Sequence, residues 1–277
     1  MNNLFLLLLP IFLISQEDGW QHIQKSRKNT ISGIAAFKNG NLVVHDNKNK
    51  NQPRISYIDN KLRITKLIWP ETELPQDLEA VAIFPGIQHR FILMESKGKC
   101  YEIIVDPKGF RIDLINTFTL PGLSPRMNLE GLTIFESGQG AVFIYGDRGS
   151  NSRPSTLFTA FFNPKKKSFY ELNQFEFDLP IPNKYRRNIS DLALKSTGKI
   201  WTSATSATEG DGSSTTAIYE LGEINNAGTF TPNHPNLLKP IMVIAKRKVE
   251  AMIFRNRHLV LIANNKNLGP SYKKFEL

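Results

Sequence analysis

The chain contains a single cysteine, Cys100, in 277 residues. One thiol cannot form an intrachain disulfide, and no cysteine or histidine stands at the spacing of a zinc site. The short signatures of a nucleophile elbow, of an HExxH metal-binding helix and of a Walker phosphate loop are also missing. The sequence therefore carries no motif of these enzyme classes, and the function has to be inferred from the fold.

Long apolar runs are equally scarce, and the one present lies at the start of the chain. Residues 4–14 are apolar apart from a break at Pro10. This segment of eleven residues is too short to span a bilayer, so no transmembrane span is expected. The small residue Ser15 and the polar stretch after it are typical of a signal peptide. We expect a signal peptide over residues 1–15, one domain over residues 16–277, and a secreted or periplasmic protein.

Acidic residues are fewer than basic ones, which leaves a formal net charge of +10 and a pI near 9.6. This excess of positive charge favours an anionic partner. The alternative interpretation is a basic surface that is simply solvated. We expect an anionic small molecule, such as a phosphorylated one, and no nucleic acid. The oligomeric state is left open.

A short phrase that occurs five times dominates what the sequence does contain. Its central residue is Ser or Glu, preceded by an apolar residue, and the copies are centred on Ser32, Glu79, Glu130, Ser190 and Glu250. The copies are therefore 47, 51, 60 and 60 residues apart. A period of this size, filled with short β-branched and aromatic runs between Gly, Pro and Asn turns, is typical of a β-propeller.

Each of the first four repeats contains four strand-like segments, the last of them over residues 230–238. The fifth repeat has only three, at 252–254, 258–263 and 272–275, before the chain ends. Residues 20–24 can supply the missing strand, because a propeller often closes its ring by joining the two termini in one blade. The sequence predicts an all-β fold, a five-bladed β-propeller of four-stranded blades whose last blade is closed by the N-terminal strand.

Antiparallel blades bring the start of each first strand and the end of each second strand to one mouth of the central channel. The phrase residues should form one oxygen-rich ring there, and Asp46, Glu95, Asp147, Thr205 or Ser206, and Asn264 a second. Carboxylate and hydroxyl oxygens favour Ca²⁺ or Mg²⁺, so Glu79, Glu130, Glu250, Ser32 and Ser190 are candidate metal ligands. Alternatively, the same side chains cap backbone N–H groups at the blade junctions.

Basic loops should surround this acidic mouth. Arg148 and Arg153 follow Asp147 directly and are candidates for gripping an oxyanion, because guanidinium forks match phosphate oxygens. His45 beside Asp46 is the best candidate for a general base. We therefore predict a catalytic group of His45, Asp46 and Asp147 beside the cation.

The phrases at residues 78–82 and 128–132, followed by Gly146-Asp147-Arg148-Gly149, resemble exported bacterial propellers. The likeness is to the families called SdiA-regulated proteins and esterase-like phytases, and it extends over residues 31–277. The resemblance implies a propeller, a cation near the channel, and a phosphoester or ester hydrolase. Many relatives have six blades, and two phrase positions here are Ser instead of Glu. A non-catalytic propeller of the cell envelope that binds a ligand or a protein is the alternative function.

Overall fold

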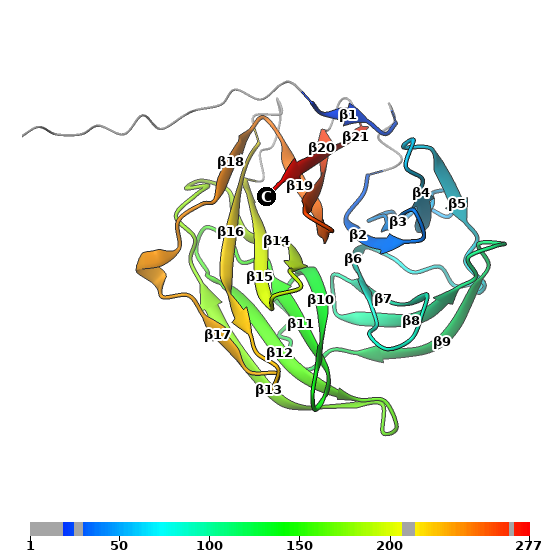
Figure 1. Cartoon of the computed structure of the whole chain (residues 1–277), viewed down its shortest axis with the longest axis horizontal. Coiled ribbons are helices and arrows are strands. Elements are labelled where there is room, and N and C mark those ends of the chain that lie inside the picture. Colours follow the sequence, from blue (N-terminus) through cyan, green and yellow to red (C-terminus); the bar gives the residue numbers. More distant parts are fainter. Residues whose placement is uncertain (1–18, 25–29, 207–213, 266–268) are drawn as a thin grey trace, which may run out of the picture.

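The computed structural model describes residues 19–24, 30–206, 214–265 and 269–277. These residues form five antiparallel sheets arranged as the blades of a ring (Figure 1). The predicted fold class, a five-bladed β-propeller, is confirmed. The expected signal peptide over residues 1–15 lies outside the described residues.

The blades are numbered from 1 to 5 along the chain. Blade 1 contains β2 (Gly33–Phe37), β3 (Gly40–Val44), β4 (Ile55–Ile58) and β5 (Ile64–Leu67). Blade 2 contains β6 (Leu78–Ile83), β7 (Arg90–Glu95), β8 (Lys99–Val105) and β9 (Ile112–Thr119). Blade 3 contains β10 (Leu129–Ser137), β11 (Gly140–Asp147), β12 (Ser155–Asn163) and β13 (Ser168–Phe177). Blade 4 begins with β14 (Arg186–Leu194), β15 (Lys199–Ser206) and β16 (Thr215–Ile224).

Blade 5 contains strands from both ends of the chain. It is built from β19 (Lys248–Arg255), β20 (His258–Asn265), β21 (Gly269–Glu276) and the N-terminal β1 (Gln21–His22). Gln21 lies opposite Tyr272 and His22 opposite Ser271, so the two termini share one sheet. This pairing confirms the predicted closure of the last blade, although the N-terminal strand is shorter than the expected 20–24.

The outer edge of blade 4 differs from the other blades. The expected fourth strand ends early, as β17 (Phe230–Pro232), and a one-turn 3₁₀ helix η2 (Pro235–Leu237) follows it. A further strand, β18 (Met242–Ala245), then pairs with the other half of β16. Proline has no N–H to donate to a ladder, so Pro232 and Pro235 explain why the strand stops where it does.

Buried apolar side chains fill the spaces between blades. Five clusters are present among the described residues, and each joins one blade to the next, including blade 5 to blade 1. In the first, Phe37 of blade 1 meets Phe91 of blade 2 with ring centroids 5.7 Å apart. Because every blade shares a core with both of its neighbours, hydrophobic burial closes the ring as well as stabilising the sheets.

The repeated phrase is explained by this packing. The apolar residue before each central Ser or Glu is fully buried in all five copies: Ile31, Leu78, Leu129, Ile189 and Val249. The residue after it is Gly or Ala in four copies, and a Cβ added to Gly131 would lie 2.7 Å from the backbone nitrogen of Leu192 in the next blade. The phrase therefore anchors each inner strand in the core and lets two inner strands approach closely. Within the described residues, no helix is long and apolar enough to cross a membrane.

Candidate functional site

The central Glu of the phrase occupies a β-bulge. Pairing between β10 and β11 passes from Leu129 opposite Asp147 to Gly131 opposite Gly146, which leaves Glu130 as the extra residue. The same register shift isolates Glu79 in β6 and Glu250 in β19. Bulges commonly redirect a side chain near functional sites. We call the end of the ring where the inner strands begin the phrase face, and the opposite end the hairpin face.

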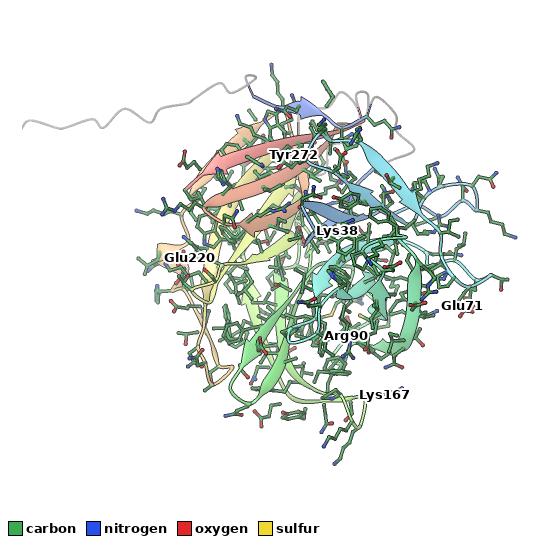
Figure 2. All side chains as sticks on the ribbon, turned by 45° about the vertical axis from the view of Figure 1, so that its right-hand side comes forward. Lys38, Glu71, Arg90, Lys167, Glu220 and Tyr272 are labelled. Carbon is green, nitrogen blue, oxygen red and sulfur yellow. The ribbon has the colours of Figure 1, made fainter. Side chains whose placement is uncertain are left out.

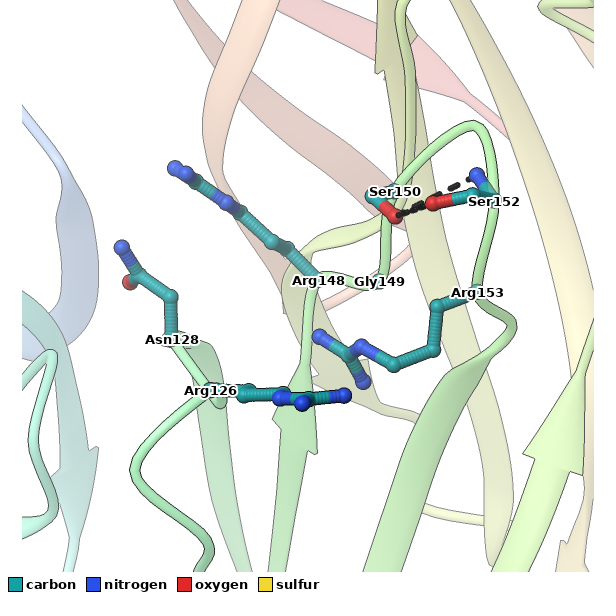
Figure 3. A pocket seen from close by; sticks show the side chains of 7 residues that line it. All are labelled: Arg126, Asn128, Arg148, Gly149, Ser150, Ser152 and Arg153. Atoms are coloured by element: carbon teal, nitrogen blue, oxygen red, sulfur yellow. Dashed lines mark hydrogen bonds between the residues drawn. The ribbon is translucent and has the colours of Figure 1, made fainter.

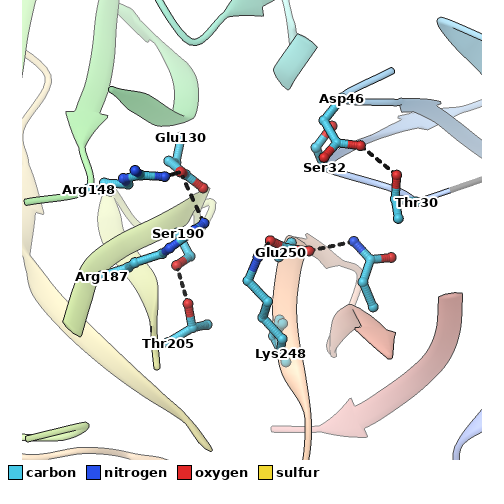
Figure 4. A network of polar contacts seen from close by, with 12 residues as sticks. Thr30, Ser32, Asp46, Glu130, Arg148, Arg187, Ser190, Thr205, Lys248 and Glu250 are labelled. Carbon is cyan, nitrogen blue, oxygen red and sulfur yellow. Dashed lines mark hydrogen bonds and ion pairs between the residues drawn. The ribbon is translucent and has the colours of Figure 1, made fainter. Parts of the chain in front are cut away.

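The three glutamates lie at the phrase face, each at or near the start of an inner strand. Charge repulsion from Glu130 and Glu250 contributes to a raised pKa of Glu79, so the three carboxylates lie within electrostatic reach of each other. Their surroundings nevertheless differ from blade to blade, and Figure 4 shows the contacts of Glu130 and Glu250.

Glu130 is buried and lies between two arginines. Arg148 Nη1 donates to its Oε1 at 2.9 Å, and Arg187 Nη1 lies 3.4 Å from the same oxygen. Burial raises the pKa of Glu130, and the positive charges of Arg187, Lys248 and Arg148 act against that rise. Its charge is thus already compensated by two guanidinium groups, Arg148 from the loop after β11 and Arg187 from the start of β14.

Glu250 is also compensated. It forms an ion pair with Lys248 two residues earlier, and Asn264 Nδ2 donates to its Oε2 at 2.6 Å. Burial raises the pKa of Glu250, but Lys248, Asn264 and Arg187 outweigh burial, so the pKa lies below its usual value. Asn264 also bonds both backbone groups of Ile31, which ties blade 5 to blade 1.

Glu79 has no such partner. Its carboxylate makes no hydrogen bond or ion pair with any described residue. Burial raises its pKa well above the usual value, and repulsion from Glu130, Asp46, Asp77 and Glu250 adds to this effect. Among the described residues, Glu79 is therefore the one phrase glutamate without a hydrogen bond or ion pair; Lys48, a positive charge within electrostatic reach of it, is paired with Asp77.

These contacts do not fit a cation held by all three glutamates and both serines. Glu130 and Glu250 are occupied by Arg and Lys, and the described residues contain no cluster of three or more His, Cys, Asp or Glu arranged for a metal. Ser32 Oγ donates to Leu78 O at 2.5 Å, and Ser190 Oγ lies 2.6 Å from Thr205 Oγ1. The five-residue Ca²⁺ or Mg²⁺ site stays a prediction. The serines do not cap backbone N–H groups as the alternative expects, because Ser32 donates to a carbonyl of blade 2 and Ser190 bonds a hydroxyl within blade 4.

His45 lies deeper than an accessible base would. Its ring is fully buried, with Nδ1 2.7 Å from Thr30 O and Nε2 2.9 Å from Ser56 Oγ. Since a carbonyl only accepts, Nδ1 carries the proton and Nε2 accepts from Ser56. Burial lowers the pKa of His45 to about 4, so the ring is neutral at physiological pH. In this arrangement His45 links the segment that enters blade 1 to strand β4, and its ring is not accessible to a ligand.

Asp46, in contrast, is exposed at the phrase face. Thr30 Oγ1 donates to its Oδ1 at 2.5 Å. The surrounding protein raises the pKa of Asp46 by desolvation, and the nearby Glu250 and Asp77 add to this rise. Of the three predicted catalytic residues, Asp46 is thus the one that a ligand can reach.

Asp147 organises the loop that follows β11. It is fully buried, accepts the backbone N–H of Asn128 at 2.8 Å and that of Gly149 at 3.2 Å, and pairs with both terminal nitrogens of Arg153. Its oxygens are therefore used in holding the loop, and Asp147 acts here as a positioning residue.

This loop and the one before β10 enclose a pocket of about 500 Å³ at the phrase face (Figure 3). Three arginines line it, together with small and polar residues: Arg126, Asn128, Arg148, Gly149, Ser150, Ser152 and Arg153. Arg148 and Arg153, the predicted oxyanion-binding residues, both line this pocket, and their role in binding stays a prediction. Asn128 was not predicted, and its side-chain oxygen is shielded from water without a hydrogen-bond partner among the described residues.

Asp191 was missed as well. It stands where the other phrases have Gly or Ala, and it is buried against blade 5. Its oxygens accept the N–H groups of Leu192 at 2.8 Å and of Met252 at 2.6 Å. The only signal in the sequence was that Asp replaces the Gly or Ala found at this position in the other phrases. In the structure its side chain links blade 4 to blade 5 by hydrogen bonds.

Comparison with known proteins supports the fold. No family model and no curated protein matches the sequence. Among solved structures, the GH43 endo-arabinanase of Bacillus licheniformis aligns with a TM-score of 0.52 and 11% identity, over 92% of this chain and 96% of that one. The Pan2 WD40 domain of Neurospora crassa aligns with a TM-score of 0.44 and 12% identity, over 88% and 74%.

At such low identity the likeness extends to the architecture and not to the site. The SdiA-regulated or phytase-like assignment stays a prediction. The chain is a β-propeller of five blades, closed by its own N-terminal strand, with an arginine-lined pocket at the phrase face.

Proposed function

We propose that this propeller binds a small molecule through a phosphate or similar oxyanion in the pocket at the phrase face. The observation that carries the proposal is the meeting of Arg126, Arg148 and Arg153 around one cavity. Guanidinium forks match the oxygens of phosphate and carboxylate groups, and several forks converging on one space favour a multiply charged anion.

The three arginines have N–H donors or fixed positions that are available to a ligand. Arg126 is exposed and has no side-chain partner among the described residues. Arg148 uses one terminal nitrogen on Glu130, which leaves its other donors available. Arg153 is fixed by Asp147, so its position is set before a ligand arrives, and preorganisation lowers the entropic cost of binding.

A cation-dependent phosphoester hydrolase is the second candidate. The observation that favours it is the carboxylate of Glu79, which forms no hydrogen bond or ion pair with the described residues and has the exposed Asp46 in electrostatic reach. Divalent cations are bound by such oxygens and can activate water or stabilise phosphate charge. In either case we propose that the protein acts outside the cytoplasm, on the basis of the signal-like segment over residues 1–15.

Removing Arg126 should weaken binding without affecting the fold. The test is calorimetric titration of inorganic phosphate, a sugar phosphate and the unphosphorylated sugar into the wild type and into Arg126→Ala. We expect both phosphates to bind, the sugar not to bind, and the variant to lose about tenfold or more in affinity, as a lost charge-assisted hydrogen bond predicts.

Arg257→Ala is the matched control, because Arg257 is exposed in the β19–β20 turn on the hairpin face. Equal affinities for all three proteins, or binding of the unphosphorylated sugar alone, would contradict an oxyanion site. Phosphate release that requires Ca²⁺ or Mg²⁺ and disappears in Glu79→Gln would favour the hydrolase over simple binding.

A further inference from the structure

The hairpin face carries a second concentration of positive charge. Nine turns close at this end of the ring, between the first and second and between the third and fourth strands of the blades. They contain ten basic residues: Lys38, Lys61, Arg63, Lys108, Arg111, Lys165, Lys166, Lys167, Lys195 and Arg257. The only acidic residues in these turns are Asp59 and Asp106. The turns thus hold a net charge of +8, compared with +10 for the whole chain.

Both aspartates serve their own turns. Asp59 accepts the backbone N–H groups of Lys61 and Arg63 and pairs with the Arg63 side chain. Asp106 accepts the backbone N–H groups of Lys108 and Gly109. Such local bonds fix the turn backbone and leave the lysine side chains pointing into solvent.

Several of these lysines lack a partner. The side chains of Lys61, Lys108, Lys165 and Lys166 are exposed and make no hydrogen bond or ion pair with any residue that the structure describes. Three consecutive lysines occupy the tip of the β12–β13 hairpin, and Figure 2 shows Lys167 at the outer limit of the molecule. Like charges this close repel each other, so an anionic surface would relieve an unfavourable arrangement.

We propose that the hairpin face docks on an anionic lipid surface. Each Lys or Arg near such a surface contributes roughly 1 kcal/mol of attraction, so several free lysines are sufficient for reversible attachment. The β6–β7 turn adds the aliphatic Ile87, which is 44% exposed on the same face. An apolar side chain among lysines suits the boundary between headgroups and acyl chains.

The composition of the face favours lipid over nucleic acid. Seven of the ten basic residues are lysines, and two of the three arginines are already paired, Arg63 with Asp59 and Arg111 with Asp113. Binding of single-stranded nucleic acid relies on exposed aromatic rings for base stacking. No aromatic side chain of the described part of these nine turns is exposed.

Docking in this orientation would keep the arginine pocket accessible. The pocket lies at the phrase face, at the opposite ends of the same strands. A protein attached by its hairpin face would therefore present the pocket toward the solution. The two surfaces are separate, so lipid attachment does not depend on the proposed ligand.

The test is sedimentation of the full-length protein with vesicles. One set contains phosphatidylcholine alone, and the other also contains phosphatidylglycerol. We expect the wild type to bind only the second set and to be released by high salt. The triple variant Lys165→Glu/Lys166→Glu/Lys167→Glu should lose about two orders of magnitude in partitioning, or about fivefold for each lysine removed.

The matched control reverses three exposed lysines on loops of the phrase face, Lys50→Glu/Lys184→Glu/Lys246→Glu, and should still bind. Equal loss in both triple variants would show an effect of net charge alone and overturn the proposal. Failure of the wild type to bind the anionic vesicles would overturn it too, as would binding of duplex DNA in preference to them.

Discussion

Replacing Asp147 with alanine should destabilise the protein by about 3–5 kcal/mol, because it removes a fully buried carboxylate and leaves two backbone N–H groups and Arg153 without their acceptor. Asp147 is fully buried and holds Arg153 and the backbone N–H groups of Asn128 and Gly149. A loss of this size corresponds to a melting temperature lower by about 10 °C. The loop at 148–153 should also lose its order, so the pocket should no longer bind phosphate.

The chain offers a closely matched control for this variant. Asp178 forms a comparable Asp–Arg pair with Arg186, but its side chain is 64% exposed. Exposed pairs contribute about 0–1 kcal/mol, so Asp178→Ala should melt close to the wild type. Thermal unfolding of the three proteins tests this, and equal melting of Asp147→Ala and Asp178→Ala would contradict the positioning role of Asp147.

Two glutamates at equivalent bulges should respond in opposite directions to the same substitution. Glu79→Gln should raise the melting temperature at neutral pH, because Glu79 is half-buried among other carboxylates and forms no hydrogen bond or ion pair with the described residues. Glu250→Gln should lower it, because Glu250 is paired with Lys248 and Asn264. The directions follow from the opposite pKa shifts of the two groups, and single substitutions of this kind typically change stability by about 0.5–3 kcal/mol, or a few degrees.

The pH dependence follows from the direction of each shift. The pKa of Glu79 is raised on folding. Glu79 therefore stabilises the folded protein at low pH, and this contribution is lost as the pH rises through the raised pKa. The pKa of Glu250 is lowered, so its contribution is present at neutral pH and is lost on acidification. Melting curves over a pH series, with and without Ca²⁺, should show these two opposite trends.

This pair of variants also tests the cation hypothesis. A cation bound at Glu79 would make Glu79→Gln destabilising in the presence of Ca²⁺ and would raise the melting temperature of the wild type. If Ca²⁺ leaves the wild type unchanged and Glu79→Gln still melts higher, the cation site is contradicted.

The architecture could be predicted because the repeat is a packing device. The apolar residue is buried in every copy, the central Glu forms a bulge in three copies and a small residue follows in four, and all three features are readable as sequence types. Closure by the N-terminal segment followed from the fifth repeat lacking a strand, and β1 pairs with β21 accordingly. The edge of blade 4 was harder, because β18 pairs with β16 only after a proline-rich interruption.

The site was predictable only in part, because spacing brings residues together but does not show their partners. The spacing of the repeats placed Glu130, Arg148 and Arg153 at one face. The pairing of Glu130 with Arg148 and Arg187 depends on the course of the backbone around it, which the spacing does not give. His45 was expected at the surface, whereas its ring turns inward to Thr30 and Ser56. Asn128 and Asp191 carry no sequence signature, since their roles arise from burial alone.

The most direct test of the central claim is a crystal of the protein soaked in tungstate, an oxyanion with a strong anomalous signal. The structure predicts a peak in the pocket within hydrogen-bond distance of Arg126, Arg148 or Arg153, and its loss in Arg126→Ala. An empty pocket in the wild type, with tungstate bound only elsewhere, would contradict the proposal that this propeller binds oxyanions there.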